Sequence, residues 1–191
     1  MADGAWYDAD IDHVIISEQQ IRDKIDELAK QVSADHTDAE GGILLVCVLK
    51  GAVMFMADFA RSLGRHGPST EMEFMAVSSY GQGTTSSGVV RILKDLDRDI
   101  ADRHVLVIED IVDSGLTLSW LMKYLESRGP ASVEVVALFR KPDAVKVQVP
   151  VRYVGFDIPS EFVVGYGLDF AERYREMPYV GVLKPEVYAR S

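Results

Sequence analysis

Cysteine is nearly absent from this chain of 191 residues, which contains only Cys47. A single cysteine excludes an intramolecular disulfide framework, and its place in an apolar segment indicates packed core and not a nucleophile. No apolar run reaches the length of about 20 residues that a membrane-spanning helix requires. None of the four histidines is paired at metal-ligand spacing, which argues against a zinc site. We therefore expect a protein of the reducing cytoplasm.

Basic residues are also scarce. Lys and Arg total 20 against 30 Asp and Glu, so the formal net charge is −10 and the sequence pI is about 4.8. This balance argues against nucleic acid or an anionic membrane as the partner. Residues 1–12 contain no basic residue and no apolar core, so we do not expect them to be a signal peptide. Length and an apolar content of 48% predict one globular domain over residues 1–191.

The most informative stretch runs from Val105 to Leu118. Four apolar residues, Val105–Ile108, predict a strand that is buried on both faces of a parallel sheet. The carboxylates Glu109 and Asp110 follow, and then a small polar turn and a predicted helix over Leu116–Ser127. A strand, a glycine-containing turn and a helix start direct several backbone N–H groups and the positive end of a helix dipole at one spot. This arrangement predicts a phosphate site.

The residues around this turn narrow the choice of phosphate. The turn lacks the lysine of a triphosphate-binding loop, and there is no G-x-G-x-x-G dinucleotide motif. Two neighbouring acids repel a phosphate unless a sugar diol, a divalent cation or both lie between them. The ligand that fits is a phosphorylated ribose. The alternative is that Asp113 or Ser114 caps the helix and that Glu109 and Asp110 form a solvated strand end.

A second strand, turn and helix precede this stretch. Ile43–Leu49 predicts a central strand, Lys50 and Gly51 form the turn, and residues 52–60 predict a mostly buried helix that closes near Gly64. Ligands of open parallel sheets collect at the carboxyl ends of strands, where such turns meet. The alternative is that Lys50 is an ordinary solvated lysine.

The rest of the chain predicts a three-layer α/β domain. Ser17–Gln20 matches a capping box, followed by apolar residues at helical spacing. Further strands are predicted at residues 70–77, 89–96 and 133–139. Residues 78–88 are polar and glycine-rich, which predicts a mobile loop. The aromatic segment from about residue 151 predicts a small subdomain.

These motifs resemble those of the type I phosphoribosyltransferases, and specifically the hypoxanthine-guanine phosphoribosyltransferases. The resemblance runs from about residue 43 to 179 and includes Leu49–Gly51, Glu109–Thr117 and Phe162–Phe170 with Arg175. It implies the type I phosphoribosyltransferase fold, a mainly parallel twisted sheet flanked by helices. It also implies a mobile lid hairpin at about 78–88 and a small hood, mainly about 151–191 plus N-terminal residues.

The resemblance implies an enzyme of purine salvage. It would convert hypoxanthine or guanine plus 5-phosphoribosyl 1-pyrophosphate to IMP or GMP plus pyrophosphate, with Mg²⁺ and an oxocarbenium-like transition state. Asp113 would be the general acid/base on the purine. The other implied roles are ribose binding by Glu109 and Asp110; 5′-phosphate binding by Asp113, Ser114, Gly115, Leu116 and Thr117; pyrophosphate binding by Lys50, Gly51 and Arg175; lid contacts by Ser79 and Tyr80; purine binding by Lys141, Phe162, Val163 and Asp169; and Mg²⁺ ligation by Glu109, Asp110 and Asp169.

Several features remain open at this stage. Leu116 stands where some members of the family carry lysine, which puts an extra cation contact with the phosphate in doubt. The family often has a cis peptide between the residues matched by Leu49 and Lys50. Hypoxanthine, guanine and xanthine all remain candidate bases, and we expect a homodimer or homotetramer. The rival functions are a regulatory phosphoribosyl sensor that binds nucleic acid and a pyrimidine or adenine phosphoribosyltransferase.

Overall fold

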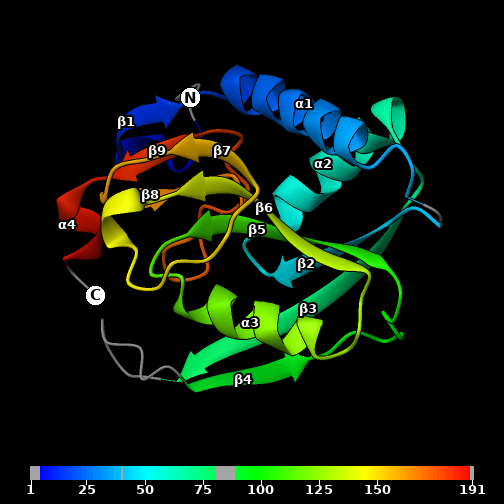
Figure 1. Cartoon of the computed structure of the whole chain (residues 1–191). Helices are drawn as coiled ribbons and strands as arrows, with labels where there is room; N and C mark the ends of the chain where they lie inside the picture. The colour runs from blue at the N-terminus through cyan, green and yellow to red at the C-terminus, as the bar shows by residue number, and fades with distance from the viewer. Residues whose placement is uncertain (1–4, 40, 81–88, 190–191) are drawn as a thin grey trace.

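A computed structural model describes residues 5–39, 41–80 and 89–189 of the chain. A six-stranded sheet with the order β4-β3-β2-β5-β6-β7 forms its centre (Figure 1). The hairpin of β3 and β4 is antiparallel, and the other neighbouring strands are parallel. The strands are β2 (Ile43–Leu49), β3 (Thr70–Tyr80), β4 (Val89–Lys94), β5 (His104–Val112), β6 (Ser132–Arg140) and β7 (Tyr153–Asp157).

Helices cover both faces of this sheet. Helices α1 (Glu18–Asp35) and α2 (Val53–His66) lie on one face, and α3 (Leu116–Glu126) lies on the other (Figure 1). Consecutive residues of a strand point to opposite faces. In β2, Leu45 and Cys47 accordingly belong to the core on the α1 and α2 side, whereas Leu44 and Val46 belong to the core on the α3 side. The predicted three-layer α/β arrangement is confirmed.

Helix α1 begins at the predicted capping box. The Ser17 hydroxyl accepts a hydrogen bond from the backbone N–H of Gln20, and the Gln20 side chain accepts one from the backbone N–H of Ser17. This reciprocal pair satisfies two N–H groups that a helix start otherwise leaves unpaired. The apolar stripe of the helix is buried, as its spacing predicts; it includes Ile21, Ile25, Leu28 and Val32.

Several predicted boundaries differ from the structure. Strand β3 runs to Tyr80 and so includes residues 78–80 of the predicted loop, and β4 ends at Lys94 and not at Leu96. Strand β5 does not end at Ile108 but continues to Val112, because β6 runs beside it and pairs Phe139 with Ile111. The acids Glu109 and Asp110 therefore lie inside the strand. Helix α2 does not close near Gly64 but runs to His66, and Gly67 forms its C-cap, donating its N–H to the Leu63 carbonyl.

A second, antiparallel sheet has the order β1-β9-β8 and is built from β1 (Ile11–Ile16), β8 (Val163–Val164) and β9 (Val180–Leu183). It lies beyond the end toward which β5 points (Figure 1). Segment 151–191 is thus divided, because β7 belongs to the central sheet. The remaining short elements are 3₁₀ turns at Asp8–Asp10 and Pro142–Ala144 and helix α4 (Pro185–Tyr188). None of the described helices is long and apolar enough to span a bilayer.

Candidate active site

The predicted phosphate loop lines a cavity at the carboxyl end of the central sheet. The cavity has a volume of about 240 Å³. Glu109 and Asp113 both face this cavity. Its other lining residues are Val48, Val77, Ile111, Val112, Ser114, Gly115, Thr117 and Leu118. The structure therefore places Glu109, Asp113, Ser114, Gly115 and Thr117 together, whereas Leu116 is not part of the cavity lining.

The backbone of this loop is held at Gly115, the N-cap of α3. Gly115 has a φ of +77°, and a Cβ there would lie 2.3 Å from the Val147 carbonyl oxygen, so only glycine fits. The Ser114 carbonyl oxygen accepts hydrogen bonds from the N–H groups of Lys146 and Val147, each at 3.0 Å. Gly115, and not Asp113 or Ser114, occupies the N-cap position. The capping alternative holds in part for Ser114, because its hydroxyl accepts a hydrogen bond from the Leu116 N–H at 3.4 Å. The first turn of α3 also contains no acidic residue, which suits an anion.

On the other face of β5, three segments meet around Asp110. A Cβ at Gly51 would lie 1.6 Å from the Asp110 carboxylate oxygen Oδ2, so the turn after β2 packs directly on this acid. Gly167, with a φ of +99°, packs in turn on Gly51, since its Cβ would lie 1.9 Å from the Gly51 carbonyl oxygen. The Leu49–Lys50 peptide is cis. Glycine is required at Gly167, because its φ is positive and the close atom is backbone, and sequence spacing alone did not indicate this.

The charged side chains of this cluster form a small network. One Arg175 nitrogen, Nη2, lies 2.9 Å from Asp169 Oδ1, and Nη1 donates to the Gly167 carbonyl oxygen at 2.8 Å. The Lys50 ammonium donates to Glu172 at 2.8 Å, a residue that the sequence analysis missed. Glu172 lies between the predicted motif Phe162–Phe170 and Arg175, three residues before the arginine, and this position could have identified it as a site residue. Arg175 Nε is buried and has no hydrogen-bond partner among the described residues, so one donor of the guanidinium stays available.

Burial sets the electrostatics of the two acids of β5. Burial, with a smaller contribution from the Asp110 charge, raises the pKa of Glu109 well above its ordinary value. Burial also raises the pKa of Asp110 to about 6; the Arg175 charge lowers this pKa and the Asp169 charge raises it. Among the described residues, neither carboxylate forms an ion pair with a basic side chain. Hydroxyl donors or a cation would stabilise their ionised forms.

The predicted purine residues lie around the small sheet. Lys141 follows β6, and its ammonium donates to the Glu161 carbonyl oxygen at 2.9 Å. Phe162 is 41% exposed, and Tyr188 stacks on its ring at 5.1 Å with an interplanar angle of 25°. Lys141, Phe162 and Tyr188 line a cavity of about 610 Å³. Val163 is buried in β8.

The remaining predicted site residues are the Mg²⁺ ligands and the lid residues. Within the described parts of the chain, no group of three His, Cys, Asp or Glu side chains is arranged to hold a metal ion. Glu109 and Asp110 are neighbours in β5 and therefore point to opposite faces of the strand. Of the lid, Ser79 and Tyr80 end β3, but their side chains and residues 81–88 lie outside the described residues.

Comparison with known proteins identifies the class. The model of the phosphoribosyl transferase domain family matches residues 15–171, and its members are phosphoribosyltransferases. The hypoxanthine-guanine phosphoribosyltransferase of Mycobacterium tuberculosis is 55% identical over 186 residues, which cover 95% of this chain and 91% of that protein. The enzyme of the same name from Bacillus subtilis is 49% identical over 179 residues, covering 94% and 97% of the two chains.

Solved structures agree with this placement. The crystal structure of a hypoxanthine phosphoribosyltransferase from Staphylococcus aureus superimposes with a TM-score of 0.92 at 41% identity, covering 98% of this chain and 99% of that one. A hypoxanthine phosphoribosyltransferase variant from Trypanosoma cruzi, in a ternary complex with substrates, gives a TM-score of 0.89 at 41% identity over 94% and 99% of the chains. The chain belongs to the hypoxanthine-guanine phosphoribosyltransferase family and has the type I fold.

Proposed function

We propose that this protein transfers the 5-phosphoribosyl group of phosphoribosyl pyrophosphate to hypoxanthine or guanine, forming IMP or GMP and pyrophosphate. The observation that carries the proposal is the shared cavity of Glu109 and the loop Asp113–Thr117 at the start of α3. A cavity with an anion-binding helix start on one side and a carboxylate on the other suits a sugar phosphate. The names of the two relatives, hypoxanthine-guanine phosphoribosyltransferase, specify the same two bases and support this proposal.

The phosphoribosyl group would lie across the end of β5. The N–H groups of Ser114–Thr117 and the hydroxyls of Ser114 and Thr117 would bind the 5′-phosphate. Glu109 and Asp110 would accept hydrogen bonds from ribose hydroxyls. A carboxylate that accepts such bonds is stabilised in its ionised form, which would offset the burial that raises the pKa of both acids.

The pyrophosphate would lie on the Asp110 face of the strand. Lys50 and Arg175 supply the two cationic side chains there, and Arg175 Nε is a buried donor without a partner among the described residues. Cations placed at the leaving group stabilise the negative charge that develops on it when the bond to ribose C1 breaks. The backbone of Gly51, which lacks a side chain, can approach an oxygen of this group closely.

We also propose Mg²⁺ as the cofactor. Mg²⁺ usually binds through one or two carboxylates together with substrate phosphates, and Asp110 and Asp169 offer such oxygens close enough for the Asp169 charge to raise the pKa of Asp110. Glu109 is a further candidate ligand. When bound, Mg²⁺ would neutralise charge on the pyrophosphate.

The purine would be recognised by Lys141, Phe162, Val163 and Asp169. Phe162 offers an exposed aromatic ring for stacking, and the Lys141 ammonium lies beside the cavity that Phe162 lines, where a 6-oxo group would accept its hydrogen bond. Asp113 would exchange the proton of a purine ring nitrogen as the general acid/base. Ser79 and Tyr80 would take part in closing the site to water, as a lid does.

We further propose that the chain assembles as a homodimer or homotetramer in the cytoplasm. Met54 and Met72 are exposed, at 37% and 53%, and Met72 borders an apolar groove between α2 and β3. Exposed apolar surface of this kind is typical of protein interfaces. The buried free thiol of Cys47 suits a reducing compartment. Light scattering on the purified chain measures the subunit number directly.

A panel of bases tests the activity. The chain is assayed with phosphoribosyl pyrophosphate, Mg²⁺ and, separately, hypoxanthine, guanine, xanthine, adenine, uracil and orotate, and the nucleotide products are measured. We expect IMP and GMP. Turnover of adenine or a pyrimidine alone would contradict the base assignment, and nucleic-acid retention without turnover of any base would contradict the enzyme assignment.

A further inference from the structure

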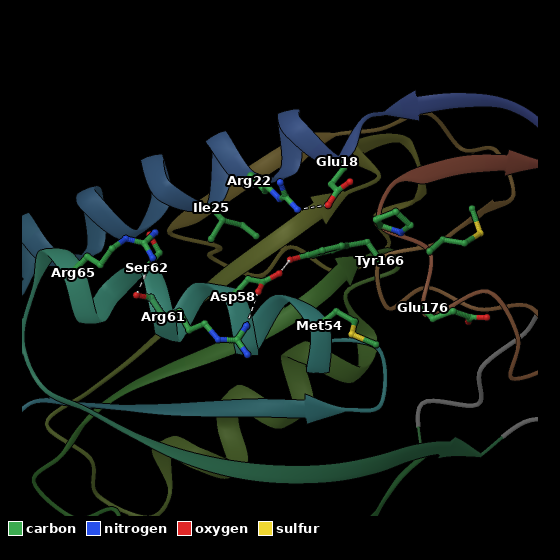
Figure 2. Close-up of a pocket in the computed structure, with 12 residues that line it drawn as sticks. Glu18, Arg22, Ile25, Met54, Asp58, Arg61, Ser62, Arg65, Tyr166 and Glu176 are labelled. Atoms are coloured by element: carbon green, nitrogen blue, oxygen red, sulfur yellow. Dashed lines mark hydrogen bonds and ion pairs between the residues drawn. The ribbon is translucent and has the colours of Figure 1, made fainter. Parts of the chain in front are cut away.

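The hydroxyl of Tyr166 joins the segment before Arg175 to helix α2. Tyr166 is 8% exposed and has a left-handed φ of +47°, and its hydroxyl donates to Asp58 Oδ2 at 2.6 Å (Figure 2). Burial, the hydrogen bond to Asp58 and the Asp58 charge raise the pKa of this hydroxyl above its ordinary value, so it remains a donor. A hydrogen bond to an ionised group is stronger and more directional than one between neutral groups.

Asp58 is held from its own helix. Its second oxygen, Oδ1, accepts a hydrogen bond from Arg61 Nη1 at 2.8 Å, so both oxygens have a partner (Figure 2). Tyr166 and Asp58 line a cavity of about 380 Å³ together with residues of α1, α2 and Glu176–Pro178. The cavity gives solvent access to this hydrogen bond from one side. The bond connects α2 to the segment that contains Arg175.

The same segment touches the pyrophosphate turn at a second point. Gly167 packs on Gly51, and the backbones of Gly167 and Arg175 are joined by a 2.9 Å hydrogen bond from Gly167 N–H to the Arg175 carbonyl. The Arg175 side chain returns to the Gly167 carbonyl at 2.8 Å. Any shift of Gly167 is thus passed to Arg175 through two hydrogen bonds.

We propose that Tyr166 and Asp58 are positioning residues for pyrophosphate binding. Gly51 lies in the turn that leads into α2, and Asp58 lies about one and a half turns along that helix. The two contacts therefore attach the Arg175 segment to one rigid unit. With the hydroxyl bond present, Arg175 and the backbone of Gly51 keep a fixed separation. The inference deepens the proposed function and depends on it for the identity of the bound group.

The variant Tyr166→Phe removes only the hydroxyl. We expect the KM for phosphoribosyl pyrophosphate and the inhibition constant of pyrophosphate to rise about tenfold, because small misplacements of binding groups cost one to two orders of magnitude, while the KM for hypoxanthine changes less than about twofold. Asp58→Asn keeps one acceptor oxygen and is expected to give a smaller rise of the same kind. It is also the second variant should Tyr166→Phe fold poorly.

The matched control is Tyr153→Phe. Tyr153 is a buried tyrosine whose hydroxyl donates to Asp35 at 2.8 Å, at the opposite end of the central sheet. Loss of this bond should lower the melting temperature as much as Tyr166→Phe does and leave both KM values unchanged. Wild-type constants for pyrophosphate in Tyr166→Phe, or an equal rise in the KM of both substrates, would overturn the inference. A wild-type chain without turnover would instead contradict the proposed function, and calorimetric titration with phosphoribosyl pyrophosphate would then still test the inference.

Discussion

The two ends of the central sheet use the same kinds of charged residue in opposite ways. At the carboxyl edge, defined by Lys50, Glu109, Asp110, Asp113 and the adjoining Arg175, burial raises the pKa of two carboxylates, neither of which forms an ion pair among the described residues. A buried charge without full compensation destabilises the folded chain. The acids of this edge therefore lower the stability of the ligand-free chain, and a bound ligand can compensate their charge.

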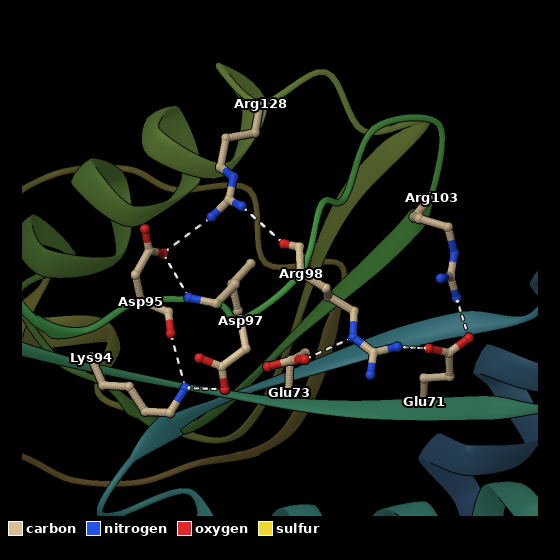
Figure 3. Close-up of polar contacts among 9 residues, drawn as sticks. Glu71, Glu73, Lys94, Asp95, Asp97, Arg98, Arg103 and Arg128 are labelled. Carbon is tan, nitrogen blue, oxygen red and sulfur yellow. Dashed lines mark hydrogen bonds and ion pairs between the residues drawn. The ribbon is translucent and has the colours of Figure 1, made fainter.

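At the amino edge, where β3, β5 and β7 begin, acids are paired with arginines. Arg98 binds both Glu71 and Glu73, Arg103 binds Glu71, and Arg128 binds Asp95 (Figure 3). Burial raises the pKa of Asp95, but hydrogen bonds from the Tyr124 hydroxyl and the Leu96 N–H outweigh it, so this pKa is lowered overall. The pKa of Asp35 is lowered chiefly by the hydrogen bond from the Tyr153 hydroxyl. Most of these charges are paired within the described residues, although Arg103 Nε, like Arg175 Nε, is buried without a hydrogen-bond partner among them. The acids of this edge are paired, so we expect them to stabilise the fold.

The difference teaches that pairing, and not residue type, separates binding acids from structural acids in this protein. Perturbed pKa values of buried groups cluster at functional sites for this reason. Substitutions of matched residues at the two edges should then have separable effects, on catalysis or affinity at one edge and on stability at the other.

The largest effect is expected for Asp113→Asn. If Asp113 exchanges the purine proton, its loss should lower kcat by about 10²–10⁴-fold, because that is the usual contribution of a positioned general acid/base. The amino-edge control is Asp97→Asn, which changes an exposed carboxylate paired with Lys94. Steady-state assays with hypoxanthine measure both. Equal kcat values in the two variants would contradict the role of Asp113.

Arg175→Lys should have the next largest effect. Lysine keeps the charge but lacks the guanidinium fork that binds Asp169 and Gly167, so we expect the KM for phosphoribosyl pyrophosphate to rise about 10–100-fold. Arg103→Lys breaks a comparable contact at the amino edge and should lower the melting temperature without changing this KM. An unchanged KM in Arg175→Lys would remove this arginine from the binding site.

Asp110→Asn should stabilise the ligand-free chain at pH 8. The pKa of Asp110 is about 6 in the folded protein against an ordinary 3.8, so the folded state binds more protons than the unfolded state between these pH values, and stability falls as the pH rises through them. If Asp110 were fully buried, this difference in pKa would correspond to a gain of at most about 3 kcal/mol in the free energy of unfolding. We expect a gain of about 1–2 kcal/mol, because Asp110 is partly exposed.

The opposite sign is expected for Asp35→Asn at the amino edge. Here the pKa of the carboxyl is lowered in the folded protein, so its contribution is present above the ordinary pKa and is lost as the pH falls through the folded-state value. Asp35→Asn should therefore lower the melting temperature at pH 8. Thermal unfolding of both variants between pH 4 and 8 measures the difference, and shifts of the same sign would break the comparison.

The smallest effect is expected at the surface of the amino edge. Lys94 and Asp97 form an ion pair at 3.0 Å with side chains 41% and 79% exposed. Exposed pairs of this kind contribute about 0–1 kcal/mol, so Lys94→Ala should change the free energy of unfolding by less than about 0.5 kcal/mol in denaturant titrations. A larger decrease in the free energy of unfolding would show that exposed ion pairs also stabilise this edge.

The strands and the first helix followed from local patterns. Apolar runs predicted β2 and β6, and the capping box placed the start of α1, because burial on one or two faces leaves a periodic trace in sequence. The continuation of β5 through Glu109 and Asp110 left no such trace. It depends on pairing with β6, and polar residues at a strand end look like a loop.

The candidate site was predictable where its residues are contiguous. The loop Asp113–Thr117 forms one cavity with Glu109, as the motif predicts. The contacts of Gly167 with Gly51 and of Tyr166 with Asp58 join residues more than a hundred positions apart, which no spacing rule reports. Tyr166 lies within the predicted motif Phe162–Phe170, but the motif assigned it no role.

The most direct test of the contrast between the two edges is calorimetric titration of phosphoribosyl pyrophosphate with Mg²⁺ at pH 8 into the wild-type chain, Asp110→Asn and Asp35→Asn. We expect at least about tenfold weaker binding by Asp110→Asn, because truncating one partner of a buried charged contact typically costs more than 1.4 kcal/mol. Asp35→Asn should bind like the wild-type chain. Wild-type affinity in Asp110→Asn, or an equal loss in both variants, would contradict the claim that unpaired acids of the carboxyl edge bind the substrate.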